Sequence, residues 1–305
     1  MENESIMKGS LIRLFAIGLF ILVANVAFAH PGSGIVVDPQ GNVYFIDTGA
    51  GIWKVDRAGN LTLLGGPKFH WMAIDVNDRL SKVALPHFAS QNATITQVGS
   101  NPTLLASSDF PITVGGDGSL YYAWAQSSDQ VKIFRLAPSR GTTIVKRLPS
   151  VRSGSHEMLW RNGLAISADG SIYCSEDKAI RKISPKDELT TVVENLSQPG
   201  CDSVPGVEPG MGPYYRGLDI DSSGTVYVAA SGCRAVLKIT ADKKVSTLLR
   251  SESPWSPTAV ALSGRDLYVL EYFHTINESR SEWIPRVRKV SPDGTVTTVA
   301  TVTRR

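Results

Sequence analysis

The stretch GLAISADGSIY, at residues 163–173, contains the pattern that decides the fold. In it, an apolar segment is followed by a polar turn that ends in glycine, and then by an apolar residue and a tyrosine. The same pattern appears as GIVVDPQGNVY at residues 34–44 and as GLDIDSSGTVY at residues 217–227. Short apolar segments on either side of a glycine-containing turn are typical of antiparallel strands. Each copy therefore predicts two adjacent strands.

Weaker copies of this pattern cover residues 71–81, 111–121 and 258–268, which makes six copies in all. Two further strand-like segments follow each copy, and the turns recur every 37 to 54 residues, close to the period of β-propeller blades. A solenoid is the alternative, but neither end of the chain shows the polar capping repeat that a solenoid needs. The sequence predicts an all-β, six-bladed β-propeller with four antiparallel strands in each blade.

The two ends of the repeat region predict how the ring closes. The first copy opens with the innermost strand of its blade, and the last strand-like segment, at residues 296–302, is the outermost strand of the sixth blade. Neither end therefore supplies a strand that the other blade lacks. We expect blade one to pack against blade six without an exchanged strand.

The first 29 residues have the features of a secretory signal peptide. Lys8 and Arg13 precede an apolar run over residues 14–29, which ends in the small-residue sequence AFA. A membrane anchor that is never cleaved is the alternative, but the run is shorter than the roughly 20 residues of a spanning helix. Cleavage would leave a mature propeller of residues 30–305 in the periplasm or outside the cell.

The formal net charge is only +3, and no run of lysine and arginine residues stands out. A nucleic-acid-binding protein would show a basic patch or stripe. We therefore expect no nucleic-acid partner and, after cleavage of the signal peptide, no membrane association. The expected molecule is a monomer whose partner is a small-molecule ligand or another protein.

The three cysteines predict one disulfide, because an exported protein folds in an oxidising compartment. Cys201 lies in the long connection before the fifth blade, and Cys233 follows the second strand of that blade. Both loops should emerge on the same face of the ring, so we predict a Cys201–Cys233 disulfide. Cys174 falls inside a strand, where a thiol packs as a small hydrophobic group.

In a propeller, the leading ends of the innermost strands and the trailing ends of the second strands share one face of the ring. Aligning the six copies places polar and aromatic side chains around the channel mouth on that face. The predicted ligand site consists of His70, Trp124, Asn162, Glu176, Arg216 and Glu271. Polar groups set among apolar walls are the ingredients of a small-molecule pocket. Each residue also has a structural interpretation: Arg216 could pair with Glu176 or Asp219, and Asn162 could cap its own turn.

The six copies resemble NHL repeats and the related gluconolactonase-like (senescence marker protein-like) family of six-bladed propellers, over essentially the whole mature chain. That resemblance implies a divalent metal at the channel mouth, held by Glu, Asn and Asp. The motif RNGL at residues 161–164 resembles the family segment that carries the asparagine, which is Asn162 here. Ser33 and Arg216 occupy the other two positions, and a guanidinium in place of an anionic ligand does not favour a divalent ion.

Two classes of function are compatible with these residues. In the first, an exported propeller binds a small anionic ligand, whose carboxylate or phosphate pairs with Arg216. We expect replacement of a partly exposed Arg216 to change the free energy of unfolding by no more than about 1 kcal/mol. In the second, a hydrolase or lyase of the gluconolactonase-like kind acts on a small organic substrate. His70 or Glu271 would then be the acid or base, with a divalent metal held by Asn162 or His70 as a further option.

Overall fold

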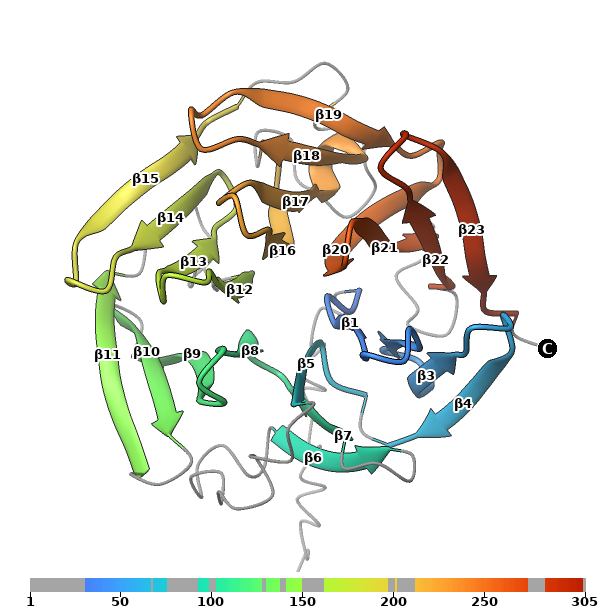
Figure 1. The fold of residues 1–305 in the computed structure, drawn as a ribbon, viewed down its shortest axis with the longest axis horizontal. Helices are drawn as coiled ribbons and strands as arrows, with labels where there is room; N and C mark the ends of the chain where they lie inside the picture. The colour runs from blue at the N-terminus through green and yellow to red at the C-terminus, as the bar shows by residue number, and fades with distance from the viewer. Residues whose placement is uncertain are drawn as a thin grey trace, which may run out of the picture.

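The computed structural model describes residues 31–66, 68–75, 93–98, 103–127, 130–137, 141–149, 162–196, 201, 212–273 and 283–303. These residues form six antiparallel sheets arranged in a ring, with the first strand of each blade innermost (Figure 1). Five sheets have four strands each, and the second sheet has three strands within the described part of the chain. The predicted all-β, six-bladed propeller is therefore confirmed.

Blade one contains β1 (Ile35–Val37), β2 (Val43–Asp47), β3 (Gly51–Val55) and β4 (Leu61–Gly65). Blade two contains β5 (Trp71–Asp75), β6 (Ala93–Val98) and β7 (Thr103–Ser108). Blade three contains β8 (Ile112–Val114), β9 (Leu120–Ser127), β10 (Gln130–Ala137) and β11 (Gly141–Pro149). Blade four contains β12 (Gly163–Ile166), β13 (Ile172–Ser175), β14 (Ala179–Ile183) and β15 (Leu189–Glu194). Blade five contains β16 (Tyr215–Ile220), β17 (Val226–Ala230), the short 3-10 turn η2 (Ser231–Cys233), β18 (Ala235–Ile239) and β19 (Val245–Arg250). Blade six contains β20 (Trp255–Ser263), β21 (Asp266–Phe273), β22 (Pro285–Val290) and β23 (Val296–Thr301).

Blade two departs from the order that the repeat predicts. The sequence pattern places a second strand directly after a turn at Asp78, but residues 76–92 lie outside the described part of the chain. The observed neighbour of β5 is β7, with Trp71 opposite Ser108, and β6 lies outside β7. The weak copy at residues 71–81 therefore predicts the inner strand correctly and the identity of its partner wrongly.

The turn of the repeat owes its shape to side-chain hydrogen bonds. In blade five, the carboxylate of Asp221 accepts the backbone N–H groups of Ser223 and Thr225, and Gly224 has a φ of +81°. The Tyr227 hydroxyl donates to the same carboxylate at 3.2 Å. The corresponding turn of blade one makes equivalent bonds. In these two copies the turn thus uses glycine for the left-handed backbone and tyrosine for the bond that closes it.

The glycine that opens the strong copies is required where neighbouring blades approach each other. A Cβ atom on Gly163 would lie 2.8 Å from the carbonyl oxygen of Arg216, and one on Gly217 would lie 2.6 Å from the Cβ of Ala259. Any larger side chain would push the innermost strands apart. The core follows the same geometry, because most apolar clusters join residues of two adjacent blades.

Contacts between blades one and six close the ring, where the first and last segments of the chain meet in Figure 1. Buried Phe45 and Tyr272 belong to one apolar cluster that spans both blades. The Tyr272 hydroxyl donates to the carbonyl of Ile46 at 2.5 Å, and the Thr258 hydroxyl donates to the carbonyl of Gly32 at 2.7 Å. Each sheet is made of consecutive strands, so closure without strand exchange is confirmed.

Cys201 and Cys233 form a disulfide, with their Cα atoms 3.8 Å apart, which confirms the predicted pairing. Cys174 is a fully buried thiol on β13. Within the described residues, no helix has the length and apolar character needed to cross a membrane. The predicted signal peptide, residues 1–29, lies outside these residues.

Candidate functional site

Asn162 lies immediately before the innermost strand of blade four, at the predicted mouth. Its amide nitrogen donates to the carboxylate of Asp177 and to the carbonyl of Tyr215, both at 2.8 Å. Asn162 and Asp177 are each only 7% exposed. Burial raises the pKa of Asp177, although the bond from Asn162 and the charge of Arg216 act in the opposite direction. Asp177 was not predicted from the sequence, where its only signal is its position directly after Glu176.

Arg216 lies at the start of β16 and is 4% exposed, so the expectation of a partly exposed arginine is wrong. Its Nη2 donates to the carbonyl of Pro31 at 2.5 Å, and its guanidinium lies 5.8 Å from the ring centre of Tyr214. Burial lowers the pKa of Arg216, and the nearby Asp177 and the tyrosines partly oppose that shift. Within the described residues, no carboxylate lies at ion-pair distance from this guanidinium.

His70 is oriented by a carboxylate that the repeat alignment did not single out. Its Nδ1 lies 2.8 Å from Oδ1 of Asp109, which follows it by 39 residues. Its Nε2 is buried and has no hydrogen-bond partner in the part of the chain that the structure describes. The imidazole ring also packs at 5.6 Å from the ring of Trp71. One nitrogen of His70 is thus held in place, and the other has no partner among these residues.

A short N-terminal segment, Pro31–Ser33, crosses the mouth and touches several of these groups. Besides the bond from Arg216 to Pro31, the Gly32 carbonyl accepts the hydroxyl of Thr258. The backbone N–H of Ser33 donates to the carbonyl of His70 at 2.6 Å. All three residues of the segment are buried. This mouth segment therefore fills part of the space between His70 and Arg216.

Three of the predicted site residues meet at this mouth. The mouth segment connects His70 to Arg216, and the indole N–H of Trp71 donates to the carbonyl of Asn162 at 2.9 Å. Trp124 lies further out on blade three, where it packs edge-on against Phe110 with ring centres 4.9 Å apart. Trp124 thus forms an apolar wall together with buried Phe110.

Glu176 and Glu271 are directed toward the next strands outward in their blades. Glu176 lies 3.4 Å from Nε of Arg181 on β14. Glu271 is fully buried, and its two oxygens accept bonds from Arg286 at 2.5 Å and Arg288 at 2.6 Å on β22. These contacts join neighbouring strands within blades four and six.

The residues at the mouth do not fit the divalent metal that the family resemblance implies. Ser33 and Arg216 stand where anionic ligands would be needed, and the Asn162 amide is bonded to Asp177. The described residues contain no group of three or more His, Cys, Asp or Glu side chains arranged to hold a metal ion. A hard divalent cation next to a guanidinium would be poorly held.

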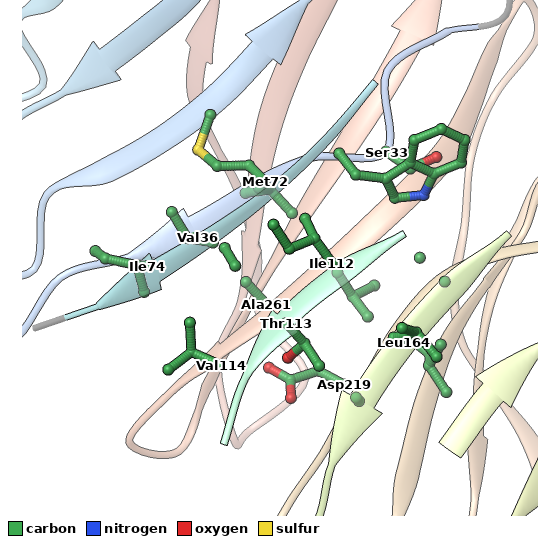
Figure 2. A pocket seen from close by; sticks show the side chains of 18 of the residues that line it. Ser33, Val36, Met72, Ile74, Ile112, Thr113, Val114, Leu164, Asp219 and Ala261 are labelled. Atoms are coloured by element: carbon green, nitrogen blue, oxygen red, sulfur yellow. The ribbon is translucent and has the colours of Figure 1, made fainter. Parts of the chain in front are cut away.

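The channel beyond the mouth contains a cavity of about 180 Å³, lined by the innermost strands of all six blades (Figure 2). Most of its side chains are aliphatic, and the one charged residue in the lining is Asp219. From the sequence, Asp219 was expected only as a possible partner for Arg216. No ion pair joins these two residues within the described structure.

No family model matches this chain, and no curated protein matches it. Among solved structures, the luciferin-regenerating enzyme is similar, with a TM-score of 0.53 and 16% identity over 89% of this chain and 92% of that chain. A streptogramin B lyase gives a TM-score of 0.50 and 14% identity over 90% of this chain and 86% of that one. A protein of unknown function from Bacteroides thetaiotaomicron gives a TM-score of 0.51 and 15% identity over 86% and 70% of the two chains.

At these identities the likeness extends to the fold alone. The ring, its inner strands and its closure define the chain as a six-bladed β-propeller. The NHL-repeat assignment made from the sequence stays a prediction, since no family model matches.

Proposed function

We propose that this protein is exported and binds a small anionic ligand at the mouth of its channel. The observation that carries the proposal is Arg216, a buried guanidinium whose hydrogen-bond partner in the described chain is a backbone carbonyl. Burying a charge is unfavourable unless an opposite charge compensates it. A carboxylate or phosphate would supply that charge and would match the planar donors of arginine.

The surroundings of Arg216 suit a ligand with polar groups besides its charge. Asn162 and His70 bring hydrogen-bonding side chains to the same mouth, and Trp124 with Phe110 forms an apolar wall. The mouth segment, Pro31–Ser33, lies against the guanidinium. A ligand that pairs with Arg216 must therefore displace this segment.

Export is supported by two features of the chain. The first 29 residues have the charge and hydrophobicity pattern of a signal peptide, and a disulfide joins Cys201 to Cys233. Disulfides persist in oxidising compartments such as the periplasm or the extracellular space. The proposed mature protein is a monomer that binds neither nucleic acid nor membranes, in keeping with its small net charge of +3.

Isothermal titration of the exported protein with a panel of small carboxylates and phosphates tests the binding proposal. Arg216→Met keeps the length of the side chain and removes its charge, and we expect at least about tenfold weaker binding, since bonds to charged groups are worth roughly 1.5 to 3 kcal/mol. Arg265→Met is the matched control, because Arg265 is exposed on a turn of blade six, and it should bind normally. Equal affinity of wild type and Arg216→Met for every anion that binds would contradict the proposal.

A hydrolase or lyase activity on a small organic substrate is the second function, and the His70–Asp109 pair is the observation that favours it. When Nδ1–H of His70 donates to Asp109, the lone pair of the neutral ring lies on Nε2, which can then accept a proton. The same fold occurs in a streptogramin B lyase, although a fold by itself does not confer an activity.

Replacing His70 tests this second function. We expect His70→Asn to lower kcat at least about a hundredfold for any open-chain or cyclic ester found to be a substrate, as is typical when a general base is removed. Asp109→Asn should lower kcat less, because Asp109 orients the ring and does not exchange the proton. Unchanged kcat in His70→Asn would exclude His70 as the base.

A further inference from the structure

The cavity inside the channel begins at the mouth and continues inward. Its lining runs from Ser33 at the mouth to the trailing parts of the innermost strands, which contribute Ile74 and Val114 (Figure 2). Asp219 lies three residues beyond Arg216 on β16, about 10 Å further along the strand at the usual rise per residue. The cavity volume, about 180 Å³, is slightly larger than an apolar cavity of about 150 Å³ that holds benzene. It is therefore large enough for a compact organic molecule.

Asp219 points into this cavity, as Figure 2 shows, and the residue is half-buried. One carboxylate oxygen accepts the N–H of Leu262 at 2.7 Å, and the other accepts the N–H of Ile220 at 2.8 Å. A carboxylate has about four acceptor positions, so these two bonds leave about half of them open. The bond from the neighbouring blade holds Asp219 in place without neutralising its charge.

No positive charge compensates Asp219 within the described residues. The charged neighbour that influences it is another carboxylate, Asp221, and no lysine, arginine or histidine lies at ion-pair distance there. Protein atoms surround the carboxylate, and this burial raises its pKa to about 6. An uncompensated carboxylate in a confined space is unfavourable, and a cation beside it would remove that cost.

The composition of the lining determines which kind of cation fits. A divalent metal needs several oxygen ligands with negative charge, and Asp219 is the one charged residue in the lining. A primary ammonium needs one carboxylate and a few neutral acceptors. The inner edges of the strands present backbone carbonyl groups to the channel, and Thr113 adds a hydroxyl. Aliphatic side chains such as Val36 and Ile74 would contact a hydrocarbon body.

We infer that the channel cavity binds a small primary ammonium compound with a compact hydrocarbon body, its nitrogen on Asp219. This site differs from the mouth site in position and in the charge of its ligand. It does not depend on the function proposed above.

Protonated benzylamine is a suitable probe, titrated into the exported protein by calorimetry at neutral pH. Benzyl alcohol and benzoate, which have the same ring with a neutral or a negative group, are the control ligands. We expect wild type to bind benzylammonium at least about tenfold more tightly than either control, a difference typical of a charge-assisted hydrogen bond. Asp219→Asn should abolish that preference.

Two further variants keep the result interpretable. Asp293→Asn removes an exposed carboxylate from a turn of blade six and should leave benzylammonium binding unchanged. Val36→Phe reduces the cavity from another blade and should weaken binding with Asp219 intact. If Asp219→Asn fails to fold, the affinities of wild type for benzylammonium, benzyl alcohol and benzoate still test whether the cavity prefers an ammonium group. Failure of wild type to bind benzylammonium, or equal binding of benzyl alcohol, would overturn the inference, whatever the outcome at the mouth.

Discussion

Arg216 and Asp219 lie on the same strand, and each is a confined charge with no oppositely charged side chain at ion-pair distance among the described residues. Burial moves both toward their neutral forms, because it lowers the pKa of Arg216 and raises that of Asp219. Arg216 faces the mouth, whereas Asp219 faces the channel. Perturbed charges of this kind concentrate at functional sites, so β16 is the strand on which both proposed sites depend.

The pKa of Asp219 predicts a pH-dependent contribution to stability. Its folded-state pKa is about 6, against an ordinary value of 3.8, so between these values the native state retains a proton that the unfolded chain releases. The stabilising contribution is therefore complete below about pH 4 and is lost as the pH rises to about 6. Two pH units correspond to about 3 kcal/mol at most, and partial exposure to the channel reduces this figure.

Urea unfolding of wild type and Asp219→Asn from about pH 4 to pH 7 measures this contribution. As the pH rises over that range, we expect wild type to lose about 1 to 2 kcal/mol of unfolding free energy relative to the variant. A hydrogen bond lost in the variant adds an offset that does not change with pH. Asp293→Asn serves as the control, because bonds to Thr295 lower the pKa of exposed Asp293. Wild type should therefore not lose stability relative to this variant as the pH rises. A difference that stays constant with pH would show that Asp219 titrates normally.

At the level of the single blade, charged side chains connect neighbouring strands. In blade six, Glu271 on β21 forms ion pairs with Arg286 and Arg288 on β22. The Ser251 hydroxyl donates a hydrogen bond to the same carboxylate. Arg286 also lies 4.1 Å from the ring centre of Trp255. The two guanidiniums are nearly buried, and the exposed Glu252 also lies 2.7 Å from Arg286 and 3.6 Å from Arg288. Glu271 is the buried carboxylate of this group, so its negative charge contributes most to compensating them.

Glu271→Gln should therefore lower the free energy of unfolding by about 3 to 5 kcal/mol, the cost of breaking a buried ion pair on one side. Chemical denaturation measures this change. Glu188→Gln is the control, because Glu188 is exposed on the turn before β15, and it should be nearly neutral. A loss of ligand affinity without a loss of stability would instead return Glu271 to the binding site that the sequence suggested.

At the scale of the whole ring, the mouth exists only because the propeller is closed. The mouth segment contacts Arg216 of blade five, Thr258 of blade six and His70 of blade two. These residues are far apart in the sequence, and they come together because blades two, five and six belong to one closed ring (Figure 1). The cavity below has the same dependence, because all six inner strands line it.

The candidate site could be predicted from the sequence only in part. Aligning equivalent positions of the repeat located His70, Asn162 and Arg216, because the leading ends of the inner strands are bound to lie on one face. Asp109 and Asp177, which contact two of these side chains, carry no signal of their own in the repeat. Their role depends on the direction of side chains across blades, which local patterns do not encode.

The sequence by itself determined the features that arise from local chemistry. The turns of blades one and five use a glycine, a carboxylate and a tyrosine within a few residues, and these types are visible in the repeat. Three strong and three weak copies imply the propeller, its closure and the face on which Cys201 meets Cys233. Only the tertiary structure decided the partner of β5, the burial of Arg216 under the mouth segment, and the isolation of Asp219 in the channel. The physical reason is that burial and charge compensation depend on groups that packing brings together from distant parts of the chain.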